Sequence, residues 1–446
     1  MTERDPRHRL PLEGVRIADI TVVWAGPHVT QLLAEWGADV IRVEPVNRMQ
    51  PYSRGGERIV TKEQAERMAE LGAGAPGYPG FDPKDDPWNR SPSFNSHARG
   101  KRSMACDIMS PEGREAFLRL VDHCDVFIEN NVPMTIEKAN ITYEVLRARN
   151  PALIMVRMPA YGLDGPYKNF RGFGTHVEGM IGHHLLRGYP DLTPEATGEA
   201  FTADAMAGVM GALAVVMALR HRRRTGQGQQ IEMPLAENFL PALGEWILDY
   251  TMNGRVAPSQ GNQHPWRAPH GTYPCEGRDQ WIAIDVGSDA EFAALCRVLG
   301  AASLAEDERF ATARGRWEYR SELDALLAER TRPRDKERLF RELQAAGVAA
   351  APVHDELEAH ADEHLNAREW FQRIAMPDVG TFPYPGLLFT MRDTPNRLHA
   401  PPPKLGEHSE EIYLDLLGYG REEYAALVAK GLVGTGYAPE LIARRD

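Results

Sequence analysis

The chain has 446 residues and a net charge of −12 at neutral pH; 43% of its residues are hydrophobic and 26% are charged. This length predicts two or three domains with an ordinary globular core, and the acidic balance argues against nucleic-acid binding, which needs a basic face. The four cysteines are far apart and form no CxxC pair, so we expect neither a zinc site nor a disulfide framework, and a reducing cytoplasm fits.

The N-terminal residues 1–12 are charged and lack the apolar core of a signal peptide. No run of the sequence reads as long and apolar enough to cross a membrane. We therefore expect a cytoplasmic protein that does not enter a membrane.

The N-terminal region predicts a βαβ unit. Residues 15–23 form a β-branched, largely apolar run that is typical of a buried strand. A short turn leads to a helix over residues 28–36, which Gly37 ends, and residues 38–44 form a second strand. Strand, helix and strand in this order predict a parallel sheet with a right-handed crossover.

The turn after the first strand is a candidate ligand site. Ligands bind beyond the carboxyl ends of the strands in such sheets, which places Val23, Trp24, Ala25 and Gly26 at a crevice. No G-x-G-x-x-G follows the first strand, so a nicotinamide or flavin site is not supported.

Strands and helices continue to alternate, which predicts an α/β fold. Residues 45–99 are polar and rich in Gly and Pro, so we expect a long excursion with one short helix near residues 61–71. Further elements are expected as strands over residues 101–107, 125–129, 152–157 and 229–233 and as helices over residues 111–122 and 143–149.

Asp204 stands at the start of a run of strong helix formers that is apolar almost all round, so we expect a buried helix there. The helix should end in the basic residues 220–224 and at Gly226. By local sequence alone, Thr202 or Asp204 is expected to be the N-cap, because an oxygen there accepts a hydrogen bond from an unpaired amide. The alternative is that the carboxylate of Asp204 does chemistry at the helix mouth.

Three histidines, His176, His183 and His184, lie at about helical spacing in a helix expected near residues 176–186. No carboxylate or cysteine completes a recognisable ligand motif with them, so we expect no metal site.

The composition shifts after an amphipathic helix expected over residues 236–252 and a Gly/Pro loop over residues 261–271. A strand over residues 281–285 and helices over residues 289–299 and 319–346 predict a second, smaller domain. Residues 352–373 are interpreted as a return segment, and residues 383–446 as a closing helical region.

Four signatures follow one another along the chain. They are Leu12-Glu-Gly-Val-Arg-Ile-Ala-Asp with Ala25-Gly-Pro and Gly37-Ala-Asp-Val-Ile-Arg-Val-Glu; Gly100-Lys-Arg-Ser with Ile128-Glu-Asn; Asp204-x3-Gly with Arg223-x-Thr-Gly-Gln-Gly-Gln; and Leu405-Gly-Glu-His. In this order, from about residue 10 to about residue 432, the chain resembles the class III CoA-transferases, the CaiB/BaiF-like family of formyl-CoA:oxalate and carnitine CoA-transferases.

The resemblance implies a Rossmann-like large domain with a parallel sheet and a smaller α+β domain, joined by long linkers in an interlocked homodimer. A heteromer with a paralogous subunit is the alternative assembly. The implied segments are residues 1–235 for the N-terminal part of the large domain, 236–270 for a linker, 271–352 for the small domain, 353–386 for the return linker and 387–446 for the rest of the large domain.

The resemblance also implies a site. The family's nucleophilic aspartate falls on Asp204, and a reduced glycine-rich substrate loop falls on Gly261 and Asn262. Coenzyme A, exchanged between an acyl-CoA donor and a carboxylic-acid acceptor, needs no metal, nicotinamide or flavin. The positions implied to contact CoA are Val23, Trp24, Ala25, Cys106, Asn130, Lys138 and Arg171.

This sequence departs from the family at three positions. Trp24 stands where the oxalate enzyme has a glutamine, Pro45 replaces a CoA-binding arginine, and Gly174 stands where relatives carry a carboxylate. The racemase of the same fold, an alternative isomerase interpretation, has a His-Asp pair where this chain has Phe173 and Gly174. A non-catalytic CoA-binding subunit of a heteromeric transferase is the second alternative.

Overall fold

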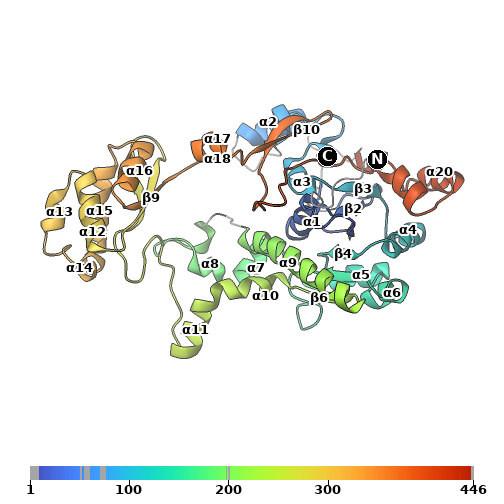
Figure 1. The fold of residues 1–446 in the computed structure, drawn as a ribbon, viewed down its shortest axis with the longest axis horizontal. Coiled ribbons are helices and arrows are strands. Elements are labelled where there is room, and N and C mark those ends of the chain that lie inside the picture. Colours follow the sequence, from blue (N-terminus) through green and yellow to red (C-terminus); the bar gives the residue numbers. More distant parts are fainter. Residues whose placement is uncertain are drawn as a thin grey trace. The chain divides into compact units, whose positions relative to one another are not determined.

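The computed structural model describes residues 10–50, 53–54, 61–70, 77–196, 198 and 201–442. These residues form two compact units (Figure 1). The first takes in Met1–Ile181, Glu199–Leu248 and Glu369–Asp446, and the second Gly182–Gly198 and Asp249–Arg368. The domain and linker limits expected from the sequence stay a prediction.

A parallel sheet organises the first unit and confirms the expected α/β fold. Its strand order is β3-β2-β1-β4-β5-β6, and every neighbouring pair is parallel. This order reverses direction between β1 and β4, the point where ligands bind in doubly wound sheets. The strands are β1 Arg16–Asp19, β2 Asp39–Glu44, β3 Arg102–Ala105, β4 Val126–Glu129, β5 Ile154–Arg157 and β6 Gln229–Glu232.

The first strand ends earlier than the apolar run 15–23 suggested. The carboxylate of Asp19 accepts hydrogen bonds from the amide and the hydroxyl of Thr21, at 2.8 and 2.6 Å. The side-chain oxygen of Asn130 accepts a hydrogen bond from the amide of Val22 at 2.8 Å. Side chains therefore replace the partner strand as hydrogen-bond acceptors, and the backbone turns away from the sheet.

Helices cover the sheet in the first unit (Figure 1). Two of them have the bounds expected from the sequence, and Ser110 caps the first of these by accepting from the amide of Gly113. The helices are α1 Ala25–Glu35, α2 Lys62–Glu70, α3 Pro92–Ala98, α4 Pro111–Asp122, α5 Pro133–Ala139, α6 Tyr143–Arg149, α7 Gly174–Met180, α9 Thr202–Thr225, α10 Leu235–Phe239, α19 Ser409–Glu411, α20 Arg421–Ala429 and α21 Pro439–Ile442.

Three expected helices are interrupted, so their predicted extents are wrong. The helix near residues 176–186 breaks at Gly182, whose φ of 93° only glycine adopts readily, into α7 and α8 (His183–Leu186). Pro241 separates α10 from α11 (Gly244–Asn253), because proline has no amide to continue a helix. Pro333 falls between α15 (Arg320–Thr331) and α16 (Lys336–Ala345).

Helix α9 is not buried all round, which corrects the expectation drawn from its composition. One face packs along α1, whereas Val209, Leu213 and Met217 are 45%, 48% and 63% exposed. By length and composition α9 could cross a membrane, so the reading that no run qualifies is also wrong. The same test is passed by core helices of soluble proteins, and α9 has an acidic residue in its first turn and three arginines in its last turn.

The second unit has an antiparallel sheet in the order β7-β8-β9, formed by His270–Pro274, Trp281–Asp285 and Ala349–Val353. A compact core of apolar side chains from this sheet and its helices holds it together. Its remaining helices are α12 Asp289–Val298, α13 Ala302–Glu306, α14 Ala313–Glu318, α17 Glu356–Ala361 and, closing the unit, α18 Glu363–Ala367.

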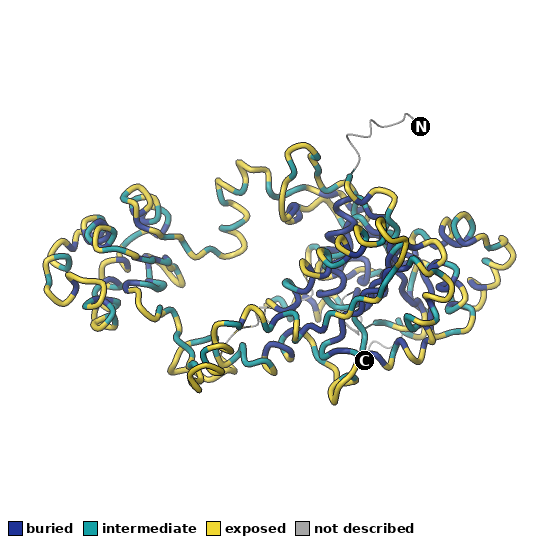
Figure 2. The backbone as a smooth tube through the Cα atoms, turned by 60° about the horizontal axis from the view of Figure 1, so that its bottom comes forward, coloured by how far each residue is buried: buried dark blue, intermediate teal, exposed yellow. Residues whose placement is uncertain are grey.

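The C-terminal part of the first unit is less helical than expected. A hairpin of β10 (Gln372–Met376) and β11 (Gly380–Tyr384) precedes it, and helices resume only at Ser409. Tyr413 and Leu405 then join the core that lies against the sheet. Figure 2 shows the buried chain gathered in the interior of the first unit.

Candidate functional site

The turn between β1 and α1 lies at the point where the strand order reverses. Asn130, directly after β4, accepts from the amide of Val22 and donates to its carbonyl oxygen, both at 2.8 Å. Val23 then adopts a φ of 66°, a left-handed conformation that costs a β-branched residue about 1–3 kcal/mol. The two hydrogen bonds between Asn130 and Val22 hold this strained turn in place.

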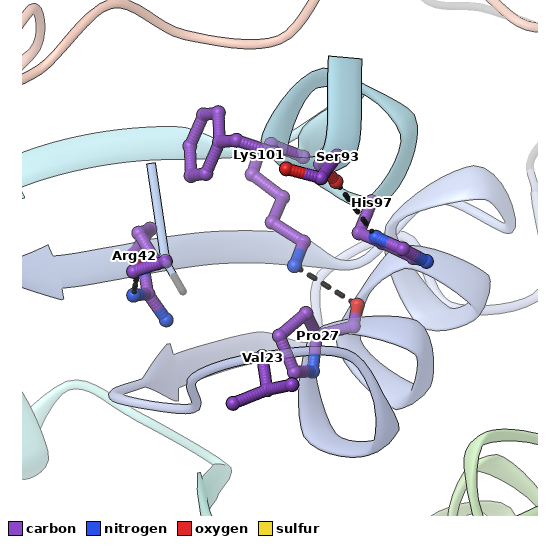
Figure 3. A pocket seen from close by; sticks show the side chains of 9 residues that line it. Val23, Pro27, Arg42, Ser93, His97 and Lys101 are labelled. Carbon is purple, nitrogen blue, oxygen red and sulfur yellow. Dashed lines mark hydrogen bonds between the residues drawn. The ribbon is translucent and has the colours of Figure 1, made fainter. Parts of the chain in front are cut away.

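Buried charged side chains stabilise the turn between β1 and α1. The ammonium of Lys101 donates to the carbonyl oxygen of Pro27 at 3.1 Å (Figure 3). It also donates to Thr30 and to the carboxylate of Asp19. Burial opposes ionisation of Asp19, but Lys101 and Arg42 outweigh it and lower the pKa of this carboxyl. The cavity beside these groups is about 10 Å³, roughly room for one water molecule. It is part of the scaffold and too small for a substrate.

Helix α9 approaches α1 closely because two glycines face it. A Cβ at Gly208 would lie 2.3 Å from Nδ1 of His28, and one at Gly211 would lie 2.5 Å from a methyl group of Val29. The glycine of the Asp204-x3-Gly signature is therefore required by packing. The close approach brings the first turn of α9, with Asp204, beside the first turn of α1.

Asp204 is not the cap of its helix, so the capping interpretation is wrong. Helix α9 begins at Thr202 after Phe201, and no side chain of the N-cap residue accepts a hydrogen bond there. The carboxylate of Asp204 instead accepts from the backbone amides of Ala25 and Gly174, on two other elements. The first turns of α1, α7 and α9 therefore meet at this carboxylate.

The carboxyl group of Asp204 is held in an environment that disfavours its charge. The residue is 4% exposed, and burial raises its pKa to about 6. The amides of Ala25 and Gly174 oppose this increase, and the negative charge of Glu178 adds to it. At neutral pH the carboxylate is mostly ionised, yet more basic than an ordinary Asp.

Gly174 is the residue that the carboxylate approaches most closely. A Cβ at this position would lie 2.0 Å from Oδ2 of Asp204, far inside van der Waals contact. The sequence marked Gly174 as a departure from relatives that carry a carboxylate there. In this chain the missing side chain is what lets the backbone amide reach Asp204.

Aromatic residues neighbour in sequence the residues that surround this carboxylate: Trp24 precedes Ala25, Phe173 precedes Gly174, and Phe201 precedes α9. The ring of Trp24 lies 5.5 Å from that of His97 and 5.6 Å from that of Phe201. Burial lowers the pKa of His28 to about 4 and that of His97 to about 3, so both imidazoles are neutral at physiological pH. Phe173 and Phe201 are 43% and 38% exposed. The rings of Trp24, His28, His97 and Phe201 are therefore uncharged at physiological pH.

The remaining positions implied to contact CoA are dispersed. Cys106 is 1% exposed inside the core, its thiol donates to the carbonyl oxygen of Gly113, and burial raises its pKa to about 12. Lys138, at the end of α5, and Arg171, shortly before α7, are exposed. The structure thus brings Val23, Trp24, Ala25, Asn130 and Asp204 together, whereas Cys106 offers no exposed side chain.

Gly261 and Asn262, the implied substrate loop, belong to the second unit. The amide of Gly261 donates to Gly188 at 3.1 Å, and the side-chain amide of Asn262 donates to Tyr189 and Thr272. Both residues line a cavity of about 500 Å³ next to His270 and Asp285.

Of the three histidines at helical spacing, His176 lies on α7, while His183 and His184 lie on α8 beyond Gly182. Within the described ranges, no three His, Cys, Asp or Glu side chains gather in a way that could hold a metal ion.

The sequence indicated Glu178 only as the next carboxylate to examine if Asp204 is not the nucleophile, and it did not indicate contributions from His28 and His97. Glu178 is fully buried, and its carboxylate accepts from the amide of Ala203 at 3.0 Å, next to Asp204. Its spacing from Gly174, four residues on one helix, could have indicated that both face the same neighbour. Nothing in the local sequence of the two histidines indicates that they flank Trp24 and α9.

A desolvated, basic carboxylate with two backbone amides directed at it can act as a nucleophile towards a carbonyl carbon. The same amides can stabilise the negative charge that develops on oxygen during such an attack. The geometry therefore suits acyl transfer.

Comparison with known proteins also indicates acyl-CoA chemistry. The model of CoA-transferase family III matches residues 12–409. The chain is 33% identical to the succinyl-CoA–D-citramalate CoA-transferase of Chloroflexus aurantiacus, over 97% of this chain and 100% of the relative. It is 31% identical to the beta subunit of the succinyl-CoA–L-malate CoA-transferase of the same organism, over 95% and 98%. A CaiB/BaiF family protein from Brucella suis superposes with a TM-score of 0.77 at 33% identity, over 92% and 100%.

Proposed function

The chain belongs to CoA-transferase family III, and from this premise we propose that it moves CoA from an acyl-CoA thioester to a carboxylic acid through covalent intermediates on Asp204. Its class as a CoA-transferring enzyme follows from the family. The observation that supports the covalent route is the carboxylate of Asp204, 4% exposed, with the amides of Ala25 and Gly174 directed at it.

In the first half of the reaction, an oxygen of Asp204 attacks the carbonyl carbon of the donor thioester. The carbon–sulfur bond breaks, CoA leaves as a thiolate, and a mixed anhydride of Asp204 and the donor acid remains. The thiolate then attacks the carbonyl carbon of Asp204, which releases the donor acid and leaves CoA bound to Asp204 as a thioester.

In the second half, a carboxylate oxygen of the acceptor acid attacks the Asp204 thioester and expels the thiolate again. The thiolate attacks the acceptor carbonyl of the new anhydride, which gives the acceptor CoA thioester and restores the carboxylate of Asp204. The amides of Ala25 and Gly174 are the donors available to the oxygen of Asp204 whenever charge develops there. CoA is the only group exchanged, and the expectation of no metal, nicotinamide or flavin stays a prediction.

We place CoA along the β1–α1 turn, past Val23, Trp24 and Ala25 towards Asp204. Asn130, Cys106, Lys138 and Arg171 are assigned to the remainder of the cofactor by resemblance to the family. For Cys106 the contact would have to come from its backbone, because its thiol is enclosed.

Replacing Lys138 by Ala is expected to weaken CoA binding several-fold with little loss of stability, because Lys138 is an exposed cation and suits a phosphate of CoA. Titration calorimetry with CoA measures the effect, and Lys430→Ala, which removes another exposed lysine, is the control. An unchanged affinity would reject this placement of the CoA phosphates.

Assembly is proposed to be an interlocked homodimer in which Gly261 and Asn262 serve as the substrate loop. The support is the apolar surface that each chain leaves uncovered on α9 and on α11, where Leu248 and Met252 are 58% and 77% exposed. Sedimentation of the purified chain at micromolar concentration should give a dimer; a monomer would count against it. A cytoplasmic location remains a prediction.

Two alternatives stay distinguishable. A racemase of this fold needs a base on each face of the α-carbon, and this chain has Phe173 and Gly174 where the racemase pair is expected. A non-catalytic subunit is suggested by the relative whose name includes a beta subunit, and it would leave Asp204 without acyl-transfer activity.

The proposal is tested by trapping. The purified protein is incubated with succinyl-CoA, chosen because the names of the two Chloroflexus transferases include it, and then with hydroxylamine. Conversion of Asp204 into a hydroxamate, read in a peptide digest by mass spectrometry, is the expected result. Absence of this modification with succinyl-CoA and with a panel of other acyl-CoA donors would reject Asp204 as the nucleophile.

A further inference from the structure

A second carboxylate lies beside Asp204 and has no step assigned to it. Glu178 is fully buried on α7, one helical turn after Gly174. Its Oε1 accepts from the amide of Ala203 at 3.0 Å, and Ala203 directly precedes Asp204 in the chain. Helix α7 therefore contacts the nucleophile region twice, through the amide of Gly174 and through the carboxylate of Glu178.

This arrangement gives Glu178 the task that the sequence assigned to Asp204 or Thr202. It satisfies an amide in the first turn of α9, where the residue before the helix offers no side-chain acceptor. The amide of Ala203 donates to this carboxylate at the positive end of the helix dipole. Asp204 is thereby released from capping and held next to a negative charge.

Glu178 is the described titratable group whose charge affects the carboxylate of Asp204. His28 is neutral, Glu35 is paired with Arg99 at 2.6 Å, and Arg157 is paired with Glu129 at 2.8 Å. The described titratable groups on the elements that pack against α9 are His28 and Glu35 on α1, His176 and Glu178 on α7, Glu237 on α10 and Arg157 on β5. Among these, only Glu178 contributes charge to the environment of Asp204.

Acylation changes the charge balance at this place. The attack on the thioester forms a bond between an oxygen of Asp204 and the acyl carbon and breaks the carbon–sulfur bond, and the electron pair leaves with sulfur. Residue 204 passes from an anion to a neutral anhydride, and Glu178 neither gains nor loses a proton. A fixed negative charge nearby therefore destabilises the state before the attack more than the state after it.

We propose that Glu178 is a positioning residue that anchors the first turn of α9 and, through its negative charge, favours conversion of the Asp204 carboxylate into its uncharged acyl form. This inference rests on the proposed function of Asp204. It also depends on Gly174, because a side chain at 174 would occupy the space of the Asp204 carboxylate.

Glu178→Gln separates the two parts of this role, since the amide keeps an oxygen for Ala203 and removes the charge. The rate of CoA thiol release from succinyl-CoA in the presence of hydroxylamine is measured against pH. In the wild type the rate should fall as pH drops through the raised pKa of Asp204, which is about 6. In the variant this acid limb should move to lower pH by about 0.5–1 unit, and the rate at pH 7 should fall several-fold.

Two controls make the result specific. Glu237→Gln makes the same chemical change on α10, at an exposed residue, and should leave the acid limb in place. The melting temperature of Glu178→Gln shows whether the fold is kept when the charge is removed and an oxygen for Ala203 remains. An acid limb that does not move, in a variant whose fold is intact, overturns the electrostatic role.

A further variant covers the case in which Glu178→Gln does not fold. Glu178→Asp keeps the charge and withdraws it by one methylene group, so the acid limb should move in the same direction by a smaller amount, and an unmoved limb overturns the inference. Failure of the proposed function looks different, because the wild type would then yield no hydroxamate on Asp204 at any pH.

Discussion

Replacing Asp204 by Asn is expected to lower the turnover of CoA transfer by at least about 10³-fold, since removal of a catalytic nucleophile can cost up to about 10⁶ in kcat. The amide of Asn cannot attack a thioester to form the anhydride. Because Asp204 does not cap α9, the substitution should leave the helix start intact. Turnover is measured by mass spectrometry of the acyl-CoA product, and the hydroxamate on residue 204 should disappear.

The same substitution has a pH-dependent effect on stability. The pKa of Asp204 in the folded chain is about 6, above its usual value of 3.8, so the folded state binds the proton more tightly than the unfolded state. Stability from this group is present below the unfolded pKa and is lost as pH rises through about 6. Relative to Asp204→Asn, the wild type should therefore lose about 2.5 kcal/mol of unfolding free energy between pH 4 and pH 8.

Denaturant unfolding of both proteins at the two pH values checks this difference. Asp393→Asn, at an exposed carboxylate, provides the matched control and should show no comparable change. If Asp204→Asn retains most of its turnover, or if its stability follows the wild type at both pH values, the desolvated nucleophile is not the correct description of Asp204.

Gly174→Ala is expected to lower turnover by about 10²-fold or more, through a single methyl group that touches no substrate. Its Cβ would lie 2.0 Å from Oδ2 of Asp204, so either the carboxylate or α7 must move. A displacement of about one ångström in a reacting group costs about this much in rate. The backbone amide of residue 174 would also lose its short approach to the carboxylate.

The measurement is kcat and KM for the acyl-CoA donor. The loss should fall mainly on kcat, because Gly174 contacts the nucleophile and has no assigned contact with CoA. Gly244→Ala is the matched control: this residue also begins a helix, and an added Cβ there meets nothing within 4 Å. Full activity of Gly174→Ala would show that the carboxylate does not occupy the place described.

Much of the fold follows from local pattern. The β-branched runs around Ile17, Ile41 and Ile154 become strands because apolar, branched side chains suit a sheet that is covered on both faces. Pro111 and the cap at Ser110 set the start of α4 by local hydrogen bonding alone. The longer helices were predicted too long where Gly182 and Pro241 break them, since periodicity continues across a break that only backbone geometry reveals.

Some features of the candidate site likewise follow from the sequence, and others depend on the tertiary structure. The sequence by itself determined the order of the signatures, the family they belong to, and Asp204 as the carboxylate of interest, because those depend on residue identity along the chain. The tertiary structure decided that Glu178 and not Asp204 holds the start of α9, and that Gly174 must lack a side chain. These depend on the approach of α1, α7 and α9, which are separated in sequence and meet only because Gly208 and Gly211 let two helices pack at short distance.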